Sequence, residues 1–306
     1  MAFRDVYSRQ VELLIRTLPH VAEESCFALK GGTAINLFVR DMPRLSVDID
    51  LTYLPEAERT DALSEIDAAL KRIAARIQKG DGSIHITESA PKTQDTINKL
   101  IVRTKNHVQI KIEVTPVLRG CVYEPEIVSI AQDAEERFGY VEINMLSNAD
   151  LYAGKIMAAL DRQHPRDLFD TRILLSNEGL TSELRDAFIV YLISHGRLPY
   201  RLLNPKLKDI TQEFEQNFMG MTEEEVPIEL LLNARAKLIK DIRQNMPDKH
   251  KKFLLSFFSL RPEWDLLGIK NASKLPAVKW REMKLNEVDE QQRSEQLDQL
   301  EEVLSR

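Results

Sequence analysis

Two aspartates, Asp48 and Asp50, alternate with apolar residues in the segment 46–51. Successive side chains of a strand point to opposite faces, so both carboxylates are expected on one face together with Ser46. Two neighbouring acids repel each other, and aspartate is a poor strand former. A divalent cation between them offsets this cost, and hard carboxylate oxygens suit Mg²⁺ or Mn²⁺. The alternative is an exposed strand with solvated aspartates.

A glycine pair, Gly31-Gly32, separates a short apolar run at 27–29 from a helical pattern at 34–38. Glycines at a strand-to-helix turn let the backbone approach another group closely, and the free amides of the helix start attract anions. Alone, such a pair is more often a simple tight turn. Beside a metal-binding carboxylate pair, it predicts a site for a triphosphate, whose reaction two metal ions would assist.

A second group of charged residues lies on the helical side of the sequence. Lys155 and Arg162 are two turns apart in an expected helix and therefore share a face. A lysine there could neutralise triphosphate charge as a point cation. Pro165 is expected to start the next helix, with Asp167 and Asp170 one turn apart near its beginning. The alternative role of these two acids is to cap that helix and complement its dipole.

Two stretches resemble the AbiEii/AbiGii-type nucleotidyltransferase toxins, which belong to the DNA polymerase β-like superfamily. The first combines Lys-Gly-Gly-Thr-Ala at 30–34 with Arg-Leu-Ser-Val-Asp-Ile-Asp-Leu at 44–51. The second runs from the lysine-bearing segment 150–155 to Arg-Asp-Leu-Phe-Asp at 166–170. The resemblance thus extends from Lys30 to Asp170.

The resemblance implies a role for each candidate residue. In that superfamily the glycine turn binds the nucleotide phosphates and the Asp-x-Asp pair binds the metals, here Asp48 and Asp50. The implied catalytic residues are Asp48, Asp50, Lys155, Asp167 and Glu113. The implied nucleotide-binding residues are Gly31, Gly32, Thr33, Ser46, Arg162, Arg166 and Asp170. In some toxins that resemble this chain, the serine that matches Ser46 is modified as a means of silencing.

Glu113 is the candidate for the third carboxylate that the superfamily places on a neighbouring strand as a general base. In the segment 109–114, Glu113 shares one face with Lys111 while the residues between them point to the core. A carboxylate near metals can accept a hydroxyl proton. The superfamily more often has aspartate here, and the alternative is a Lys111–Glu113 pair on an open sheet face.

The elements that must position these residues follow from hydrophobic periodicity. Helices are expected at the N-terminus around 11–18 and over 56–78, and strands near 83–88, 97–104 and 108–115, the last two joined by a turn at Asn106-His107. After about residue 145 strand patterns give way to helical ones, near 148–162, 167–176, 181–194, 222–243 and 249–259. The segment 285–306 is expected to be a peripheral helix or partly disordered.

These elements predict an α+β fold. Residues 1–145 are expected to form a nucleotidyltransferase-like domain with a mixed sheet and flanking helices. Residues 146–306 are expected to form a helical domain that contributes Lys155 and Asp167 to the site.

The composition indicates the kind of protein and the cellular compartment in which this chemistry would take place. The 306 residues carry a net charge of −6 and are 43% hydrophobic and 29% charged, which is typical of a soluble globular protein. The two cysteines have no metal-like spacing, which fits a reducing compartment. The sequence has no signal peptide pattern and no apolar run long enough to cross a bilayer, so a cytoplasmic protein without membrane partners is expected.

Basic and aromatic residues are interleaved in the C-terminal half, between Lys249 and Lys284. This pattern could form a groove for an RNA backbone with stacking surfaces. The alternative is a helical core with a solvated face. The aromatic residues concerned are Phe253, Phe257, Phe258, Trp264 and Trp280.

The leading hypothesis is transfer of a nucleoside monophosphate from an NTP to an RNA acceptor, the 3′ end of tRNA, with Mg²⁺ or Mn²⁺ as cofactor. The resemblance implies a toxin–antitoxin or phage-defence system with an AbiEi-like antitoxin encoded nearby. Two alternatives remain open. One is transfer to a protein or small molecule, and the other is a degenerate fold that serves as a non-catalytic interaction module.

Overall fold

The computed structural model describes residues 5–91 and 96–305, which divide into two compact units. The first unit comprises residues 1–147 and 219–225, and the second comprises 148–218 and 226–306. The first unit combines a mixed sheet with helices, whereas the second is helical, which confirms the predicted α+β class. None of the helices within the described ranges is long and apolar enough to span a membrane.

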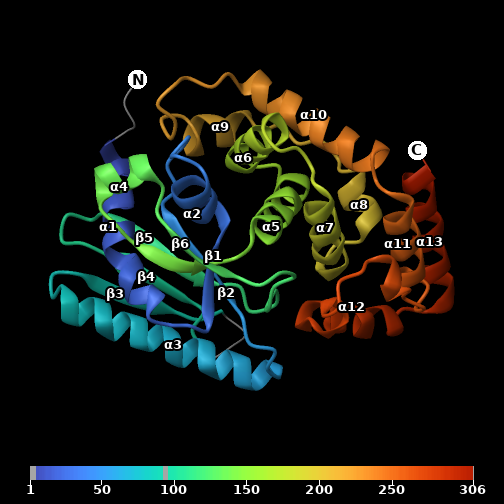
Figure 1. Cartoon of the computed structure of the whole chain (residues 1–306), viewed down its shortest axis with the longest axis horizontal. Coiled ribbons are helices and arrows are strands. Elements are labelled where there is room, and N and C mark those ends of the chain that lie inside the picture. The colour runs from blue at the N-terminus through green and yellow to red at the C-terminus, as the bar shows by residue number, and fades with distance from the viewer. Residues whose placement is uncertain (1–4, 92–95, 306) are drawn as a thin grey trace. The chain divides into compact units, whose positions relative to one another are not determined.

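The described residues of the first unit form a seven-stranded mixed sheet in the order β3-β4-β5-β2-β1-β7-β6 (Figure 1). Strand β2 pairs antiparallel with β1 and parallel with β5, so it lies in the middle of the sheet. The strands are β1 (Phe27–Lys30), β2 (Asp48–Tyr53), β3 (His85–Ser89), β4 (Lys99–Arg103), β5 (Gln109–Val114), β6 (Glu126–Ser129) and β7 (Glu142–Met145).

One face of this sheet is apolar and is covered by α1 (Asp5–Ala22) and α3 (Arg59–Gly80). Alternation in the central strands puts Ile49 and Leu51 of β2 and Ile112 of β5 on that face, where all three are fully buried. Asp48 and Asp50 of β2, and Lys111 and Glu113 of β5, alternate with these apolar residues. The sequence pattern therefore separates a packed face from a polar one, and the polar face carries the candidate residues.

Strand β1 leads directly into α2 (Gly31–Ala34), which continues as a π-helical turn over Ile35–Val39. Such wider turns inside helices occur often at functional sites. The helix expected after the glycine pair is confirmed. Strand β2 begins at Asp48, so Ser46 lies just before the strand instead of inside it.

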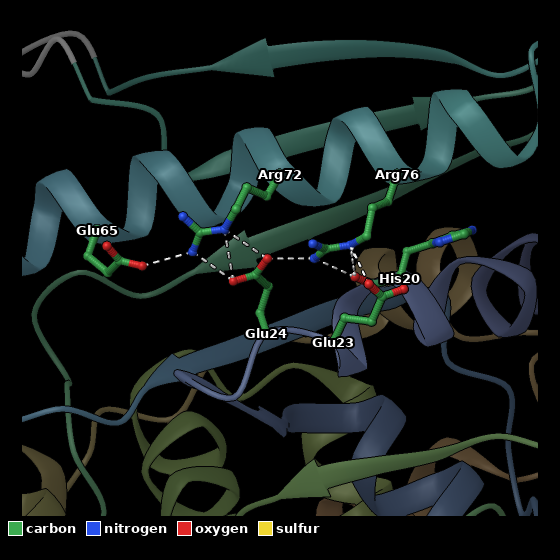
Figure 2. Close-up of polar contacts among 6 residues, drawn as sticks. All are labelled: His20, Glu23, Glu24, Glu65, Arg72 and Arg76. Carbon is green, nitrogen blue, oxygen red and sulfur yellow. Dashed lines mark hydrogen bonds and ion pairs between the residues drawn. The ribbon is translucent and has the colours of Figure 1, made fainter.

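A cluster of charged side chains fastens the loop before β1 to helix α3 (Figure 2). Glu24, only 8% exposed, accepts hydrogen bonds from Arg72 Nη2 at 2.8 Å and Arg76 Nη2 at 2.6 Å. Arg76 also donates to the backbone oxygen of His20 at the end of α1, at 2.9 Å. Burial raises the pKa of the Glu24 carboxyl, but the two guanidinium groups outweigh it and hold the pKa below its usual value. This cluster fixes the start of β1 and hence the glycine turn behind it.

The segment 219–225 joins the first unit although it follows helices of the second. Leu45 N donates to Met221 O at 2.8 Å, and Arg137 pairs with Glu223 at 2.6 Å. The sequence analysis wrongly began a helix at residue 222, because this return of the chain has no local pattern that distinguishes it from the helix that follows.

The second unit is built from helices that pack in pairs, among them α5 with α7 and α6 with α10. The helices expected near 148–162, 167–176, 181–194 and 249–259 are confirmed, and the segment after 285 is mostly helical. The helix expected over 222–243 begins only at Ile228. The helices are α5 (Asn148–Asp161), α6 (Pro165–Ser176), α7 (Ser182–Ser194), α8 (Pro199–Leu203), α9 (Thr211–Asn217), α10 (Ile228–Gln244), α11 (Asp248–Phe258), α12 (Pro276–Asn286) and α13 (Glu290–Ser305).

The three phenylalanines of this stretch, Phe253, Phe257 and Phe258, belong to the helical core, whereas Trp280 is 38% exposed. Phe253 and Phe257 are buried, and the Trp264 ring lies 5.1 Å and 6.0 Å from their ring centroids. Lys249 pairs with Asp186 at 2.7 Å. The predicted RNA groove with stacked bases is therefore wrong for these phenylalanines, because amphipathic helical spacing buried the rings that could have stacked.

The sequence missed the elements between 120 and 145. These are β6, β7 and the short helix α4 (Gln132–Phe138). Strand β7 pairs parallel with β1 through Leu29 and Met145, far apart in the chain, and β6 is a largely exposed edge strand. Neither has enough alternating apolar residues to be recognised locally.

We expect Glu24→Gln to lower the free energy of unfolding by roughly 1–3 kcal/mol at neutral pH, because it removes a buried charge that two arginines share. Since the folded-state pKa of Glu24 is depressed, its contribution is present above the unfolded-state pKa and is lost as the pH falls through the folded value. Urea denaturation of both proteins should thus show a difference that shrinks below about pH 4.

The matched control is Glu65→Gln, which removes a 46% exposed carboxylate from the same cluster. Exposed pairs contribute little, so a loss below about 1 kcal/mol is expected. Equal losses for the two variants would show that Glu24 is not the centre of the cluster.

Candidate active site

The glycine turn and the acidic strand approach each other more closely than any side chain would permit. In the antiparallel β1–β2 pair, Lys30 lies opposite Asp50. Gly31, the next residue, has a φ of +77°, and a Cβ built there would lie 2.5 Å from Asp50 Oδ2. Both the left-handed backbone and the short approach require glycine. The structure thus brings Gly31 and Asp50 together, as a phosphate-and-metal site would need.

The second glycine faces the residues just before β2. A Cβ on Gly32 would lie 2.8 Å from Ser46 Oγ and 2.9 Å from Arg44 Nη2. Arg44 is only 1% exposed, and its Nη1 donates to Leu45 O at 2.9 Å. The guanidinium is therefore fixed beside the glycine turn. Arg44 begins the motif at 44–51, but the sequence analysis assigned it no role. A buried arginine next to a glycine turn of this kind indicates an anion-binding site.

Thr33 holds the turn to the strand. Its side chain is fully buried, and its hydroxyl donates to the backbone oxygen of Asp48 at 2.6 Å, with Ser46 Oγ 3.2 Å away. Ser46 is 5% exposed. The hydroxyl of Thr33 is thus engaged with the backbone, and what it offers an incoming phosphate is its amide at the start of α2.

The two aspartates project from the polar face of the sheet, where both are half-buried. Across the parallel β2–β5 pair, Asp48 lies beside Lys111 and Asp50 lies beside Glu113. Glu113 is thus on the neighbouring strand, as expected for the third carboxylate. Its ion pair is with Lys99 of β4 at 3.0 Å, and not with Lys111 as the alternative interpretation held.

Lys30 is the residue of this face that the sequence did not single out. Its Nζ donates to Thr115 Oγ1 at 2.8 Å. Burial lowers the pKa of the Lys30 ammonium, while the charges of Asp50 and Glu113 act in the opposite direction. The lysine places a cation within electrostatic range of both carboxylates. Its position just before a glycine pair, at the end of a strand, could have marked it as a phosphate contact.

The donor set of the first unit fits a hard divalent cation. Asp48 and Asp50 supply carboxylate oxygens from one face of one strand, beside backbone that carries no Cβ. Across residues 5–91 and 96–305, no group of three or more His, Cys, Asp or Glu side chains is arranged to hold a metal ion. The protein thus offers two carboxylates, and Mg²⁺ commonly completes its coordination with substrate phosphates and water.

The second unit contains a buried ionic cluster made of the residues predicted from the later motif. Lys155 Nζ on α5 lies 3.0 Å from Asp167 Oδ1 and 2.9 Å from Asp170 Oδ2, both on α6. Arg162 makes two bonds to Asp167, at 2.5 and 2.9 Å. Lys155 is 6% exposed and the two carboxylates are fully buried, whereas the Arg162 side chain is 58% exposed.

Asp167 is the centre of this cluster. Burial alone raises the pKa of its carboxyl, but the charges of Lys155 and Arg162 outweigh burial and hold the pKa well below the usual range. The carboxylate is consequently ionised, doubly paired and inaccessible. It orients Lys155 and leaves Arg162 as the member of the cluster that reaches solvent.

The start of α6 is capped by a residue that the sequence did not assign. His164 Nδ1 accepts a hydrogen bond from Arg166 N at 3.1 Å, and Pro165 occupies the first position of the helix, as predicted. Capping of this helix by Asp167 or Asp170 is therefore the wrong alternative, because both carboxylates turn inward to Lys155.

Comparison with known proteins places these arrangements in a family. Residues 12–280 match the profile of a family described as nucleotidyl transferase AbiEii toxin, type IV toxin–antitoxin system. The chain belongs to the AbiEii toxin family. Its fold is similar to that of MenT4, a nucleotidyltransferase toxin from Mycobacterium tuberculosis H37Rv. The TM-score is 0.56 with 14% sequence identity, over 98% of this chain and 95% of that chain, a likeness that concerns the fold. No curated protein sequence matched the chain.

The AbiEii match includes every candidate residue between Gly31 and Asp170. The family resemblance read from the sequence is thereby confirmed, and the chain is a nucleotidyltransferase toxin of the type IV toxin–antitoxin class. Members of such enzyme classes use NTPs and divalent metals, in keeping with the two half-buried aspartates of β2.

We expect Gly31→Ala to destabilise this AbiEii toxin by about 1–2 kcal/mol from the left-handed backbone alone, and by more because the new Cβ meets Asp50. The matched control is Gly268→Ala, whose φ is +70° but whose Cβ would have nothing within 4 Å. Urea denaturation measures both. Equal losses would mean that the Gly31–Asp50 approach carries no energetic weight.

We expect Lys155→Met to lower the free energy of unfolding by about 3–5 kcal/mol, because it leaves Asp167 and Asp170 buried without their shared cation. Arg162→Met, which truncates a largely exposed side chain of the same cluster, should cost less. Thermal and urea denaturation would compare the two variants. A larger loss for Arg162→Met would contradict the central position of Lys155.

Proposed function

We propose that this chain transfers a nucleoside monophosphate from an NTP to the 3′-hydroxyl of an RNA, with the 3′ end of tRNA as the acceptor. Family membership supports the reaction class. The observation that carries the proposal is the bare backbone of Gly31 against the Asp50 carboxylate. That contact brings backbone without a side chain directly against the carboxylate proposed to bind metal, a close approach that an ordinary tight turn does not require.

In this proposal the first unit supplies the phosphate and metal ligands. The amides of Gly31, Gly32 and Thr33 and the hydroxyl of Ser46 hold phosphate oxygens, since the helix start there offers backbone donors. Mg²⁺ or Mn²⁺ bound by Asp48 and Asp50 would polarise the phosphoryl oxygens and offset the charge of the leaving pyrophosphate.

Glu113 is the proposed proton acceptor of this face. Its carboxylate lies in register with Asp50 and pairs with Lys99 of β4 at 3.0 Å. The acceptor hydroxyl oxygen forms the new bond to the α-phosphorus, the bond to pyrophosphate breaks, and the hydroxyl proton passes to the Glu113 carboxylate.

The second unit supplies positive charge for the nucleotide. Arg162 is exposed enough to meet a phosphate, and its two bonds to Asp167 hold the guanidinium in one orientation. Lys155 keeps Asp167 ionised from the buried side, so we assign Lys155 and Asp167 to positioning Arg162. Arg166 and Asp170 complete the proposed nucleotide-binding set.

The biological setting proposed is a cytoplasmic toxin–antitoxin or phage-defence pair, with an AbiEi-like antitoxin encoded nearby as the partner. Type IV membership supports an antitoxin. The acidic balance of the chain, −6 overall, does not oppose an RNA acceptor, because binding depends on where the cations lie.

The decisive experiment incubates the pure protein with each of the four labelled NTPs and total RNA, and separately with a protein lysate. We expect label in RNA of tRNA size. Asp48→Asn should reduce labelling by about 100-fold or more. Its fold should be kept, because the side chain is half-exposed. Removing divalent metal with a chelator should abolish labelling, and adding Mg²⁺ back should restore it.

Glu126→Gln, which neutralises an exposed carboxylate on the edge strand β6, is the matched control and should label RNA like the wild type. Label that appears only in protein would overturn the RNA acceptor and favour the alternative transferase. Growth inhibition by Asp48→Asn equal to that of the wild type would favour the non-catalytic module.

A further inference from the structure

The second unit contains a pocket of about 380 Å³ between helix α10 and the segment that follows α8. Pro205 and Leu207 line it on one side, and Leu232 and Arg235 of α10 line it on the other. The volume lies within the usual range of small-molecule pockets. It is large enough for more than a single small ion.

The charges of this pocket are all positive. Among the residues that the structure describes, its lining includes Arg235, Lys240 and Arg243 and no Asp or Glu. The acid of α10 nearest to them in sequence, Asp241, pairs with Arg185 of α7 at 2.8 Å. The pocket therefore concentrates three cations in an otherwise acidic chain, on a helix whose neighbouring carboxylate is used elsewhere.

Of these three cations, Arg235 is the one whose charge is most costly to bury. The residue is only 9% exposed, and its Nη1 donates to Gln163 Oε1 at 3.0 Å and to Lys208 O at 2.7 Å. Both acceptors are neutral. Burial lowers the pKa of the Arg235 guanidinium, and no acid acts against that effect. A buried charge without a counter-ion is expensive, and a bound anion would remove that cost.

Arg243 has unused hydrogen-bonding capacity in the same place. Its Nη1 reaches only Asn204 Oδ1, at 3.4 Å. Its Nε is buried and has no hydrogen-bond partner among the residues that the structure describes. Lys240 is exposed at the rim. The guanidinium groups of Arg235 and Arg243 and the Lys240 ammonium line the same pocket, and arginine binds oxyanion oxygens in bidentate fashion.

We propose that this pocket, formed by Arg235, Lys240 and Arg243 with Pro205 and Leu207, binds the phosphate group of a nucleotide or of a nucleic-acid backbone. The three cations match a phosphate that carries one or two negative charges. The apolar wall accommodates the ribose or base attached to it. The shared chemistry is a phosphate ester, and a free nucleotide and an RNA strand are its two sources.

Arg235 is held ready for this ligand. Gln163, which accepts its hydrogen bond, is 1% exposed and has a φ of +54°, and it also accepts from Lys208 N at 3.0 Å. The guanidinium is therefore fixed before any ligand arrives, which reduces the entropy lost on binding. The assignment rests on charge and burial in the second unit and does not depend on the proposed transfer reaction.

The test measures binding to the full-length protein of three probes: inorganic phosphate, adenosine monophosphate and a short oligouridylate. The pocket variant is Lys240→Gln/Arg243→Gln. The control is Lys237→Gln/Lys252→Gln, which removes the same charge from exposed positions of α10 and α11 outside the pocket. Isothermal titration gives the affinities, and thermal denaturation verifies that both variants fold like the wild type.

We expect the pocket variant to bind at least one probe about tenfold or more weakly than the wild type, and the control to stay within about twofold. Weakened adenosine monophosphate binding with unchanged oligouridylate binding identifies a free nucleotide as the ligand. Weakened oligouridylate binding identifies an RNA backbone as the ligand. The slope of log K against log salt concentration should then fall by about two, one for each lost phosphate contact. The proposal is overturned if the wild type binds none of the probes, or if the control loses as much affinity as the pocket variant.

Discussion

The Asp50 carboxylate occupies the space that a side chain at position 31 would need. This approach is possible because β1 and β2 pair antiparallel, with Lys30 opposite Asp50, and because Gly31 continues the chain with a left-handed φ. The other features of the polar face follow from this contact. The Thr33 hydroxyl donates to the backbone oxygen of Asp48, and the glycine turn lies beside the carboxylates. A β-carbon at position 31 would separate the turn from the strand.

The two units differ in how deeply they bury the aspartates of their motifs. In the first, Asp48 and Asp50 stay half-buried on a sheet face. In the second, Asp167 and Asp170 are fully buried and share Lys155. Half-buried carboxylates keep contact with solvent, whereas fully buried ones must be paired inside the protein. This difference is why we assign metal binding to the strand residues and positioning to the helical ones.

Sequence patterns predicted what depends on local spacing. Alternation in 46–51 indicated the shared face of Asp48 and Asp50, and helical spacing brought Lys155 and Arg162 to one face, where both meet Asp167. What the sequence missed depends on distant pairing. The parallel contact of β7 with β1 and the return of 219–225 to the first unit join segments that carry no local signal. Whether a basic and aromatic stretch is surface or core is likewise decided by packing.

Two buried arginines of the second unit, Arg235 and Arg281, differ in what stabilises their charge. Arg281, like Arg235, is buried, and burial lowers its pKa with no acid acting against it. Its guanidinium, however, lies 5.6 Å from the Phe258 ring centroid and donates to Arg197 O at 3.0 Å. An aromatic face stabilises a cation without a counter-ion. Arg235 lines an open pocket beside two other cations and has no such ring to stabilise it. The protein itself therefore stabilises the buried charge of Arg281, whereas the proposed anion would stabilise that of Arg235.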